Sequence, residues 1–202
     1  MGGQQMVHIV DDDAAMRDSL AFLLGAEGLA TETYESGPAL LSAAGRLTGC
    51  IVTDVRMPGM TGIELMRRLR EAGVSLPVIV ITGHGDVPLA VEAMRGGAID
   101  FLEKPFDDAL IIRSVRNALQ SGAAQRERTE ERAAVAARLA TLSNRELQVL
   151  DGLVAGHANK VIAYDLGISP RTVEVYRANL MTKMQADSLS DLVRMKLLTG
   201  QQ

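Results

Sequence analysis

Five polar residues stand at the ends of short strand-like runs in the first half of this chain, and their types suit phosphoryl chemistry. Asp11 and Asp12, Asp54, Thr82 and Lys104 each close a run that resembles a buried β-strand. Ligands of open parallel sheets bind beyond the carboxyl ends of the strands, so these side chains are expected to meet at one edge. Three carboxylates, a hydroxyl and an ammonium brought together form a site for a divalent cation and a phosphoryl group.

Each group has its own role in such a site. Carboxylates at close range repel one another unless a cation neutralises them. A cluster of oxygen ligands suits Mg²⁺, which keeps several of its bound waters. Lys104 would neutralise one phosphoryl oxygen, and the Thr82 hydroxyl would donate to another. Asp54 is the best candidate for a nucleophile, because it follows the central apolar run Cys50–Thr53 and a carboxylate can form an aspartyl phosphate. A single strand-end acid is more often a helix cap, so the hypothesis depends on convergence.

Strand-like and helical patterns alternate up to about residue 120, which predicts the elements that carry these residues. Alternation of this kind is typical of a doubly wound α/β fold with a five-stranded parallel sheet. The runs at 50–53 and 78–81 are apolar throughout, as strands covered on both faces should be. The expected strands are 7–11, 30–34, 50–54, 78–82 and 99–103, and the expected helices are 14–27, 36–46, one beginning at Thr61, 87–95 and 107–119.

The last third of the chain reads as helical throughout. Ser143 and Glu146 form a capping box, and Ser169-Pro170 supplies a cap followed by a proline at the first helical position. Gly167 marks the end of the helix that precedes it. The sequence therefore predicts an all-α, four-helix domain with helices from about 144, 159, 170 and 188.

Composition and charge divide the chain in the same way. Of 202 residues 47% are apolar, enough for packed cores, and the net charge of −4 is uneven: −6 over residues 1–124, zero over 125–137 and +2 over 138–202. Residues 121–137, rich in alanine and in charges of both signs, favour an exposed helical linker, with disorder as the alternative. The predicted domains are 1–122 and 139–202, with a linker at 123–138.

Nothing in the sequence predicts a secreted or membrane-bound chain. There is one cysteine, Cys50, so no disulfide framework is available. The first residues lack the basic and apolar regions of a signal peptide, and no apolar run approaches the roughly 20 residues that span a bilayer. We expect a cytoplasmic protein without a membrane partner.

Residues 6–122 resemble the receiver domain of two-component response regulators, which has a flavodoxin/CheY-like fold. The resemblance is carried by residues on four strand ends: Asp11-Asp12, Asp54 with Met57-Pro58-Gly59, Thr82-Gly83, and Lys104-Pro105. It implies that Asp54 accepts phosphate from a sensor histidine kinase. It also implies that Mg²⁺ is held by Asp11, Asp12, Asp54 and the backbone carbonyl of Arg56, and that the Lys104–Pro105 bond is cis.

The same resemblance implies that Phe101 is a conformational switch residue. In the family an aromatic residue at this place turns inward as the hydroxyl corresponding to Thr82 moves toward the phosphate; the alternative is an ordinary core phenylalanine. The switch would remodel one face of the domain, where a second copy of the chain could bind. The candidate dimer residues are Val87, Val91, Met94, Ile111, Ile112 and Val115.

Ala163, Gly167 and Val173 have the spacing of a helix-turn-helix, in which alanine permits close helix approach and glycine allows a positive φ. Residues 139–199 resemble LuxR/NarL-type DNA-binding domains, and both domains together resemble the FixJ group. Glu174, Val175, Ala178 and Asn179 are candidates for base contacts, and basic residues for phosphate contacts. The full set of candidate DNA-binding residues is Lys160, Arg171, Thr172, Glu174, Val175, Arg177, Ala178, Asn179 and Lys183.

These features predict a phosphorylation-controlled transcription regulator that dimerises and binds promoter DNA. The resemblance to the family favours an activator. RNA polymerase is a candidate further partner. One competing hypothesis is a phosphatase of the haloacid-dehalogenase type, which needs a second Asp two residues after the first; Arg56 occupies that place, so no enzyme is expected. The other is a protein adaptor, because helix-turn-helix folds also serve in protein binding.

Overall fold

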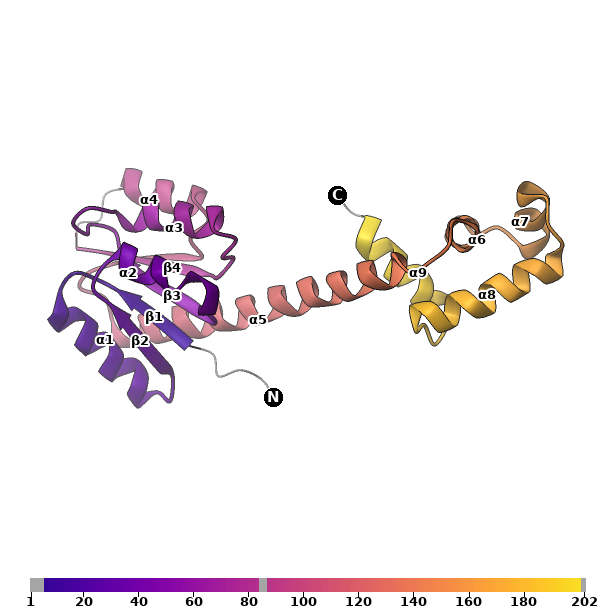
Figure 1. Cartoon of the computed structure of the whole chain (residues 1–202). Coiled ribbons are helices and arrows are strands. Elements are labelled where there is room, and N and C mark those ends of the chain that lie inside the picture. Colours follow the sequence, from indigo (N-terminus) through magenta and orange to yellow (C-terminus); the bar gives the residue numbers. More distant parts are fainter. Residues whose placement is uncertain (1–5, 84–86, 201–202) are drawn as a thin grey trace. The chain divides into compact units, whose positions relative to one another are not determined.

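The computed structural model describes residues 6–83 and 87–200 and divides the chain into two compact units, Met1–Gln125 and Arg126–Gln202 (Figure 1). Each unit has a hydrophobic core of its own. The units are therefore described separately.

The first unit is built on a parallel sheet, as the sequence predicts. Its strand order is β2-β1-β3-β4-β5, and neighbouring strands run parallel. Every residue of β3 and β4 is buried, which explains their unbroken aliphatic character. The strands are β1 Met6–Val10, β2 Ala30–Tyr34, β3 Cys50–Asp54, β4 Val78–Thr82 and β5 Asp100–Glu103.

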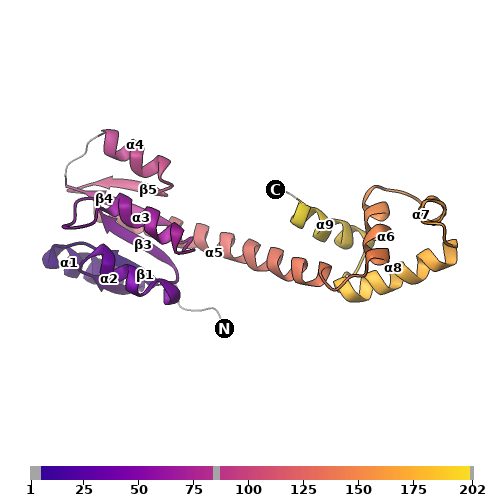
Figure 2. The same cartoon turned by 45° about the horizontal axis from the view of Figure 1, so that its top comes forward.

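Helices cover both faces of this sheet, as Figures 1 and 2 show. Apolar side chains of α1 and α5 pack on one face, and those of α2, α3 and α4 pack on the other. The doubly wound fold class is thus confirmed. The helix expected over 36–46 is instead α2 followed by a short 3₁₀ turn, Ala44–Arg46. The bounds are α1 Ala14–Ala26, α2 Gly37–Ser42, α3 Gly62–Glu71, α4 Val87–Arg95 and α5 Asp108–Leu139.

Helix α5 is a continuous helix of 32 residues that includes the segment expected to be a linker. The segment is helical, not disordered. Its last part belongs to the second unit, because Val135 is buried in that unit's core and Glu131 forms an ion pair with Arg194, 2.7 Å between Oε1 and Nη1. The second compact unit accordingly starts at Arg126 and takes in residues that the sequence pattern assigns to a linker.

The second unit is helical in all its described elements. On α8, Val173, Leu180 and Met184 are fully buried, so one side of this helix faces the core of the unit. Gly167, between α7 and α8, has a φ of 65°, a left-handed conformation that favours glycine. Beyond the end of α5 the helices are α6 Asn144–Val154, α7 Asn159–Leu166, α8 Pro170–Met184 and α9 Leu189–Gly200.

Candidate phosphoryl site and nucleic-acid surface

Asp11, Asp54 and Lys104 meet at the carboxyl edge of the sheet. The Lys104 ammonium donates to Asp11 Oδ2 at 2.8 Å and to Asp54 Oδ1 at 2.7 Å. Asp11 and Asp54 are only 1% and 7% exposed. Strands β1 and β3 are neighbours in the sheet, so their terminal carboxylates start close together, and Lys104 reaches them from the end of β5. Convergence of these three groups is what the strand ends predict.

Backbone amides hold the remaining carboxylate oxygens. The N–H of Asp13 donates to Asp11 Oδ1 at 2.9 Å, and the N–H of Arg56 donates to Asp54 Oδ2 at 2.6 Å. The guanidinium of Arg17 donates to the Asp11 carbonyl at 2.7 Å, a contact that the sequence did not suggest. Each carboxylate oxygen keeps a further lone pair, so both acids are oriented and still able to bind a cation.

The ammonium of Lys104 is stabilised in its charged form by its two acidic neighbours. Burial would lower the pKa of Lys104, but hydrogen bonds and charge attraction from Asp11 and Asp54 outweigh that effect and raise it above its ordinary value. Lys104 is thus held in its charged form between the two carboxylates.

The other predicted residues of the pocket lie as follows. Thr82 is buried at the end of β4, and its carbonyl accepts the Lys104 backbone N–H at 2.7 Å. Phe101 is partly buried against the core that contains α3 and α4, and the Lys104–Pro105 bond is cis as expected. Asp12 is exposed. Within residues 6–83 and 87–200, no three acidic, His or Cys side chains are already arranged to hold a metal ion.

Gly62 is a further residue on which the site depends, and sequence reasoning missed it. A Cβ placed on Gly62 would overlap the Asp54 carbonyl oxygen, and the Gly62 N–H donates to the Val55 carbonyl at 2.9 Å. The start of α3 therefore lies directly against the end of β3. The only signal in the sequence is a glycine at the first position after the capping residue Thr61.

We predict that Gly62→Ala will destabilise the first unit, because the added methyl forces α3 away from Asp54. Overpacking of this kind costs typically about 1–3 kcal/mol. Thermal unfolding of the full chain measures it, together with labelling by acetyl phosphate, which should fall as well. Gly25→Ala in α1 is the matched control, since its Cβ meets nothing within 4 Å. Equal unfolding temperatures for Gly62→Ala and the parent chain would show that the close approach has no energetic weight.

The structure corrects part of the predicted dimer surface. Ile111 and Val115 are fully buried against the sheet, so they belong to the core and are unavailable to a second copy. The sequence pattern shows that these two residues are apolar, but it does not show that their side chains face the sheet. Val91 and Met94 are 43% and 48% exposed, and Ile112 is partly buried. The side chain of Val87 lies outside the described residues.

The outward face of α8 presents the residues expected to read bases. Glu174, Val175, Ala178 and Asn179 are all exposed, and Val175 is 56% exposed although it is apolar. Its neighbour Arg171 is exposed at the start of the same helix. Lys160, on α7, is exposed too, whereas Thr172 is partly buried and its hydroxyl pairs with Ser169 Oγ at 2.8 Å.

Two of the expected phosphate contacts already have partners inside the unit. Arg177 donates to Asn159 Oδ1 at 2.9 Å, which joins α8 to the start of α7. Lys183 donates to Glu146 Oε2 at 2.8 Å, and Glu146 is the buried acid of the capping box on α6. Lys183 therefore helps fix α8 on α6, a role that its position in the sequence does not reveal.

Comparison with known families agrees with this geometry. Residues 7–116 match the response regulator receiver domain, and residues 140–196 match the luxR family of bacterial regulatory proteins. The chain belongs to the two-component response regulators that join a receiver domain to a LuxR-type DNA-binding domain. It is therefore a phosphorylation-controlled transcription regulator, with a sensor kinase and DNA as the classes of partner that its two domains imply.

Individual relatives extend over nearly the whole chain. The transcriptional regulatory protein FixJ of Azorhizobium caulinodans is 62% identical over 195 residues, 96% of this chain and 92% of that protein. Full-length FixJ from B. japonicum is a structural neighbour with a TM-score of 0.61 and 50% identity, covering 98% of each chain. The response regulator StyR has a TM-score of 0.86 and 38% identity, covering 96% of this chain and 99% of that one.

No described helix has the length and apolarity needed to cross a bilayer.

Proposed function

We propose that Asp54 is the phospho-acceptor of this regulator. The supporting observation is the buried pair of Asp11 and Asp54 joined by the Lys104 ammonium. An Asp54 oxygen attacks the phosphorus of a phosphohistidine on the kinase and the P–N bond breaks. The histidine leaves as neutral imidazole, keeping the proton on its other ring nitrogen. Lys104 neutralises charge on the transferred group, and the Thr82 hydroxyl donates to another of its oxygens.

The donor set of the pocket fits Mg²⁺. Asp11, Asp54, the exposed Asp12 and the Arg56 carbonyl offer only hard oxygen ligands, which this ion prefers. When bound, the ion would neutralise charge on the phosphoryl oxygens. The chain's own part is to hold Asp11 and Asp54 in fixed orientations through the amides of Asp13 and Arg56.

Phosphorylation would act through Thr82 and Phe101. The partly buried ring of Phe101 packs against the same core as α4, so its movement would alter the surface near Val91 and Met94. These two exposed apolar residues and the partly buried Ile112 are our candidates for contact with a second copy. A homodimer would place two α8 helices on paired half-sites and raise affinity for promoter DNA. We further propose that the bound dimer activates transcription, with RNA polymerase as its partner at the promoter.

The test combines sedimentation with binding to promoter fragments, with and without beryllofluoride and Mg²⁺. Beryllofluoride stands in for the phosphoryl group on Asp54. The expected result is a shift from monomer toward dimer and tighter DNA binding only when both are present. A sedimentation profile and a DNA affinity that both stay unchanged would contradict the proposal.

The proposed reading face of α8 makes a further prediction. Ala178→Arg should change the base preference, because a guanidinium reads guanine in the major groove where a methyl group cannot. Selection of binding sites from a randomised DNA pool measures it. Ala140→Arg, the same change at another exposed alanine, is the control and should keep the parent preference. If Ala178→Arg selects the parent sequences, α8 does not read bases at this position.

A further inference from the structure

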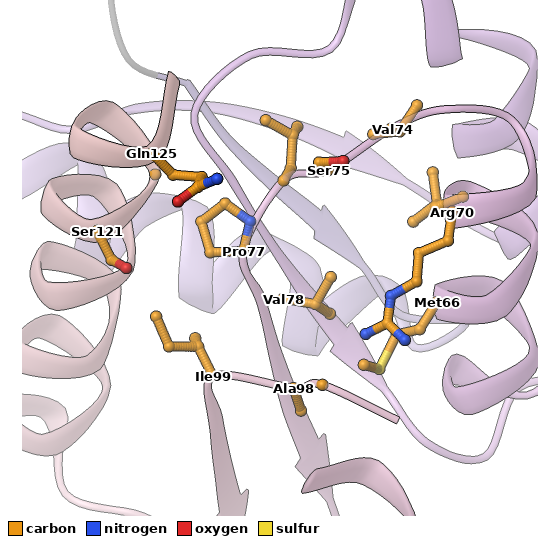
Figure 3. Close-up of a pocket in the computed structure, with 14 residues that line it drawn as sticks. Met66, Arg70, Val74, Ser75, Pro77, Val78, Ala98, Ile99, Ser121 and Gln125 are labelled. Carbon is orange, nitrogen blue, oxygen red and sulfur yellow. The ribbon is translucent and has the colours of Figure 1, made fainter. Parts of the chain in front are cut away.

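A cavity of about 420 Å³ opens at the end of the receiver sheet opposite Asp54 (Figure 3). It lies beside Val78, where β4 begins, and Ile99, just before β5. The C-terminal end of α3, the loop at 74–77 and α5 form its walls. The volume falls within the roughly 300–1,000 Å³ of small-molecule sites. No step of phosphoryl transfer or DNA binding uses this cavity.

The lining combines an apolar floor with polar groups on facing walls. Pro77, Val78 and Ile99 contribute the floor in Figure 3, and Arg70 on α3 stands across the cavity from Gln125 on α5. A pocket of this kind accommodates a ligand with an apolar body, while a few polar groups fix its orientation.

Arg70 supplies a positive charge at the wall of the cavity. It is exposed, and within the described residues its guanidinium takes part in no ion pair. A Cβ placed on Gly97 would overlap Arg70 Nη2, so the guanidinium lies directly against the Gly97 backbone. Gly97 also has a φ of 82°, a conformation that favours glycine. Arg70 therefore reaches the cavity wall because Gly97 has no side chain.

The opposite wall is a helix held at close range. A Cβ on Gly122 would lie 3.0 Å from Pro77 Cγ, so glycine permits α5 to lie against the loop at 74–77. Glycine inside a helix costs about 1 kcal/mol relative to alanine. Here it brings Ser121 and Gln125 to the rim of the cavity.

We propose that this cavity binds a small organic carboxylate, with its apolar body on Pro77, Val78 and Ile99 and its carboxylate on Arg70. A guanidinium pairs with a carboxylate through two parallel N–H···O bonds, which gives both affinity and orientation. The apolar floor selects against inorganic anions, which have nothing to place on it. The ligand would bridge α3 and α5.

The experiment is a titration of the full chain with 4-phenylbutyrate, followed by methyl NMR of Met66, Val78 and Ile99. The expected result is a saturable shift of all three methyl signals. The matched alcohol, 4-phenylbutan-1-ol, should bind on the order of tenfold more weakly, because it lacks the charge-assisted bond. Inorganic phosphate should leave the three signals in place. Absence of saturable shifts with 4-phenylbutyrate, or equal shifts with phosphate, would overturn the proposal.

Variants locate the charge contact. Arg70→Gln should weaken 4-phenylbutyrate binding on the order of tenfold. Arg67→Gln, on the same helix, is the control: both arginines border the neighbouring groove between α3 and α4, but only Arg70 also borders this cavity. Equal weakening by the two changes would mean general charge attraction and would refute the site. Asp54→Asn should bind the compound as the parent does, so this test is independent of the phosphoryl site.

Discussion

Replacing Asp54 by asparagine is expected to abolish labelling of the chain by acetyl phosphate. The carboxamide keeps the shape of the side chain and can still accept a bond from Lys104, but it lacks the anionic oxygen that attacks phosphorus. Asp54 is 7% exposed and its two oxygens are held by Lys104 and the Arg56 amide, so the oxygen that would attack has a fixed orientation. Incorporated phosphate per chain is the quantity measured.

The control for this variant is Asp18→Asn, the same change at an exposed acid on α1. It should be labelled to the level of the parent chain. Both variants need unfolding temperatures near that of the parent, which establishes that the pocket is intact. Stoichiometric labelling of a folded Asp54→Asn protein would remove Asp54 from the role of acceptor.

The second large effect is expected for the combined change Lys160→Ala and Arg171→Ala. Both residues are exposed on the helix-turn-helix, and we assign both to DNA phosphates. Each phosphate contact contributes about 0.9 to the slope of log affinity against log salt, so the double variant should lower that slope by about 2. Affinity should fall on all sequences alike, because phosphate contacts carry no base information.

Arg128→Ala combined with Arg132→Ala controls for bulk charge. It removes the same number of exposed positive charges, but from α5. If both double variants weaken binding equally, the effect is one of net charge and not of the proposed surface. An unchanged affinity and slope for Lys160→Ala with Arg171→Ala would instead favour the adaptor hypothesis.

The meeting of Asp11, Asp54 and Lys104 was predictable because parallel strands bring their carboxyl ends to one edge of the sheet. The aliphatic runs that form β3 and β4 identify buried central strands. The polar residues at the ends of the strands therefore lie at the same edge of the sheet. The doubly wound fold followed from the same alternation. Glycine at 167 and the caps at Ser143 and Ser169 located the helices of the second unit for equally local reasons.

Features that depend on tertiary neighbours were not predictable. Helical periodicity gives Ile111 and Val115 the same character as the exposed Val91, and only the packing of α5 on the sheet separates them. The pairing of Lys183 with Glu146 joins residues on different helices, so no local pattern reports it. The cavity beside Arg70 likewise arises from segments that meet only in the folded domain.

The most direct test is site-mapped mass spectrometry of the unmodified chain after incubation with acetyl phosphate, in Mg²⁺ or in EDTA. We expect the mass of one phosphoryl group on the peptide that contains Asp54, present with Mg²⁺ and absent with EDTA. A folded chain that gains no such mass, or gains it at another residue, would contradict this expectation.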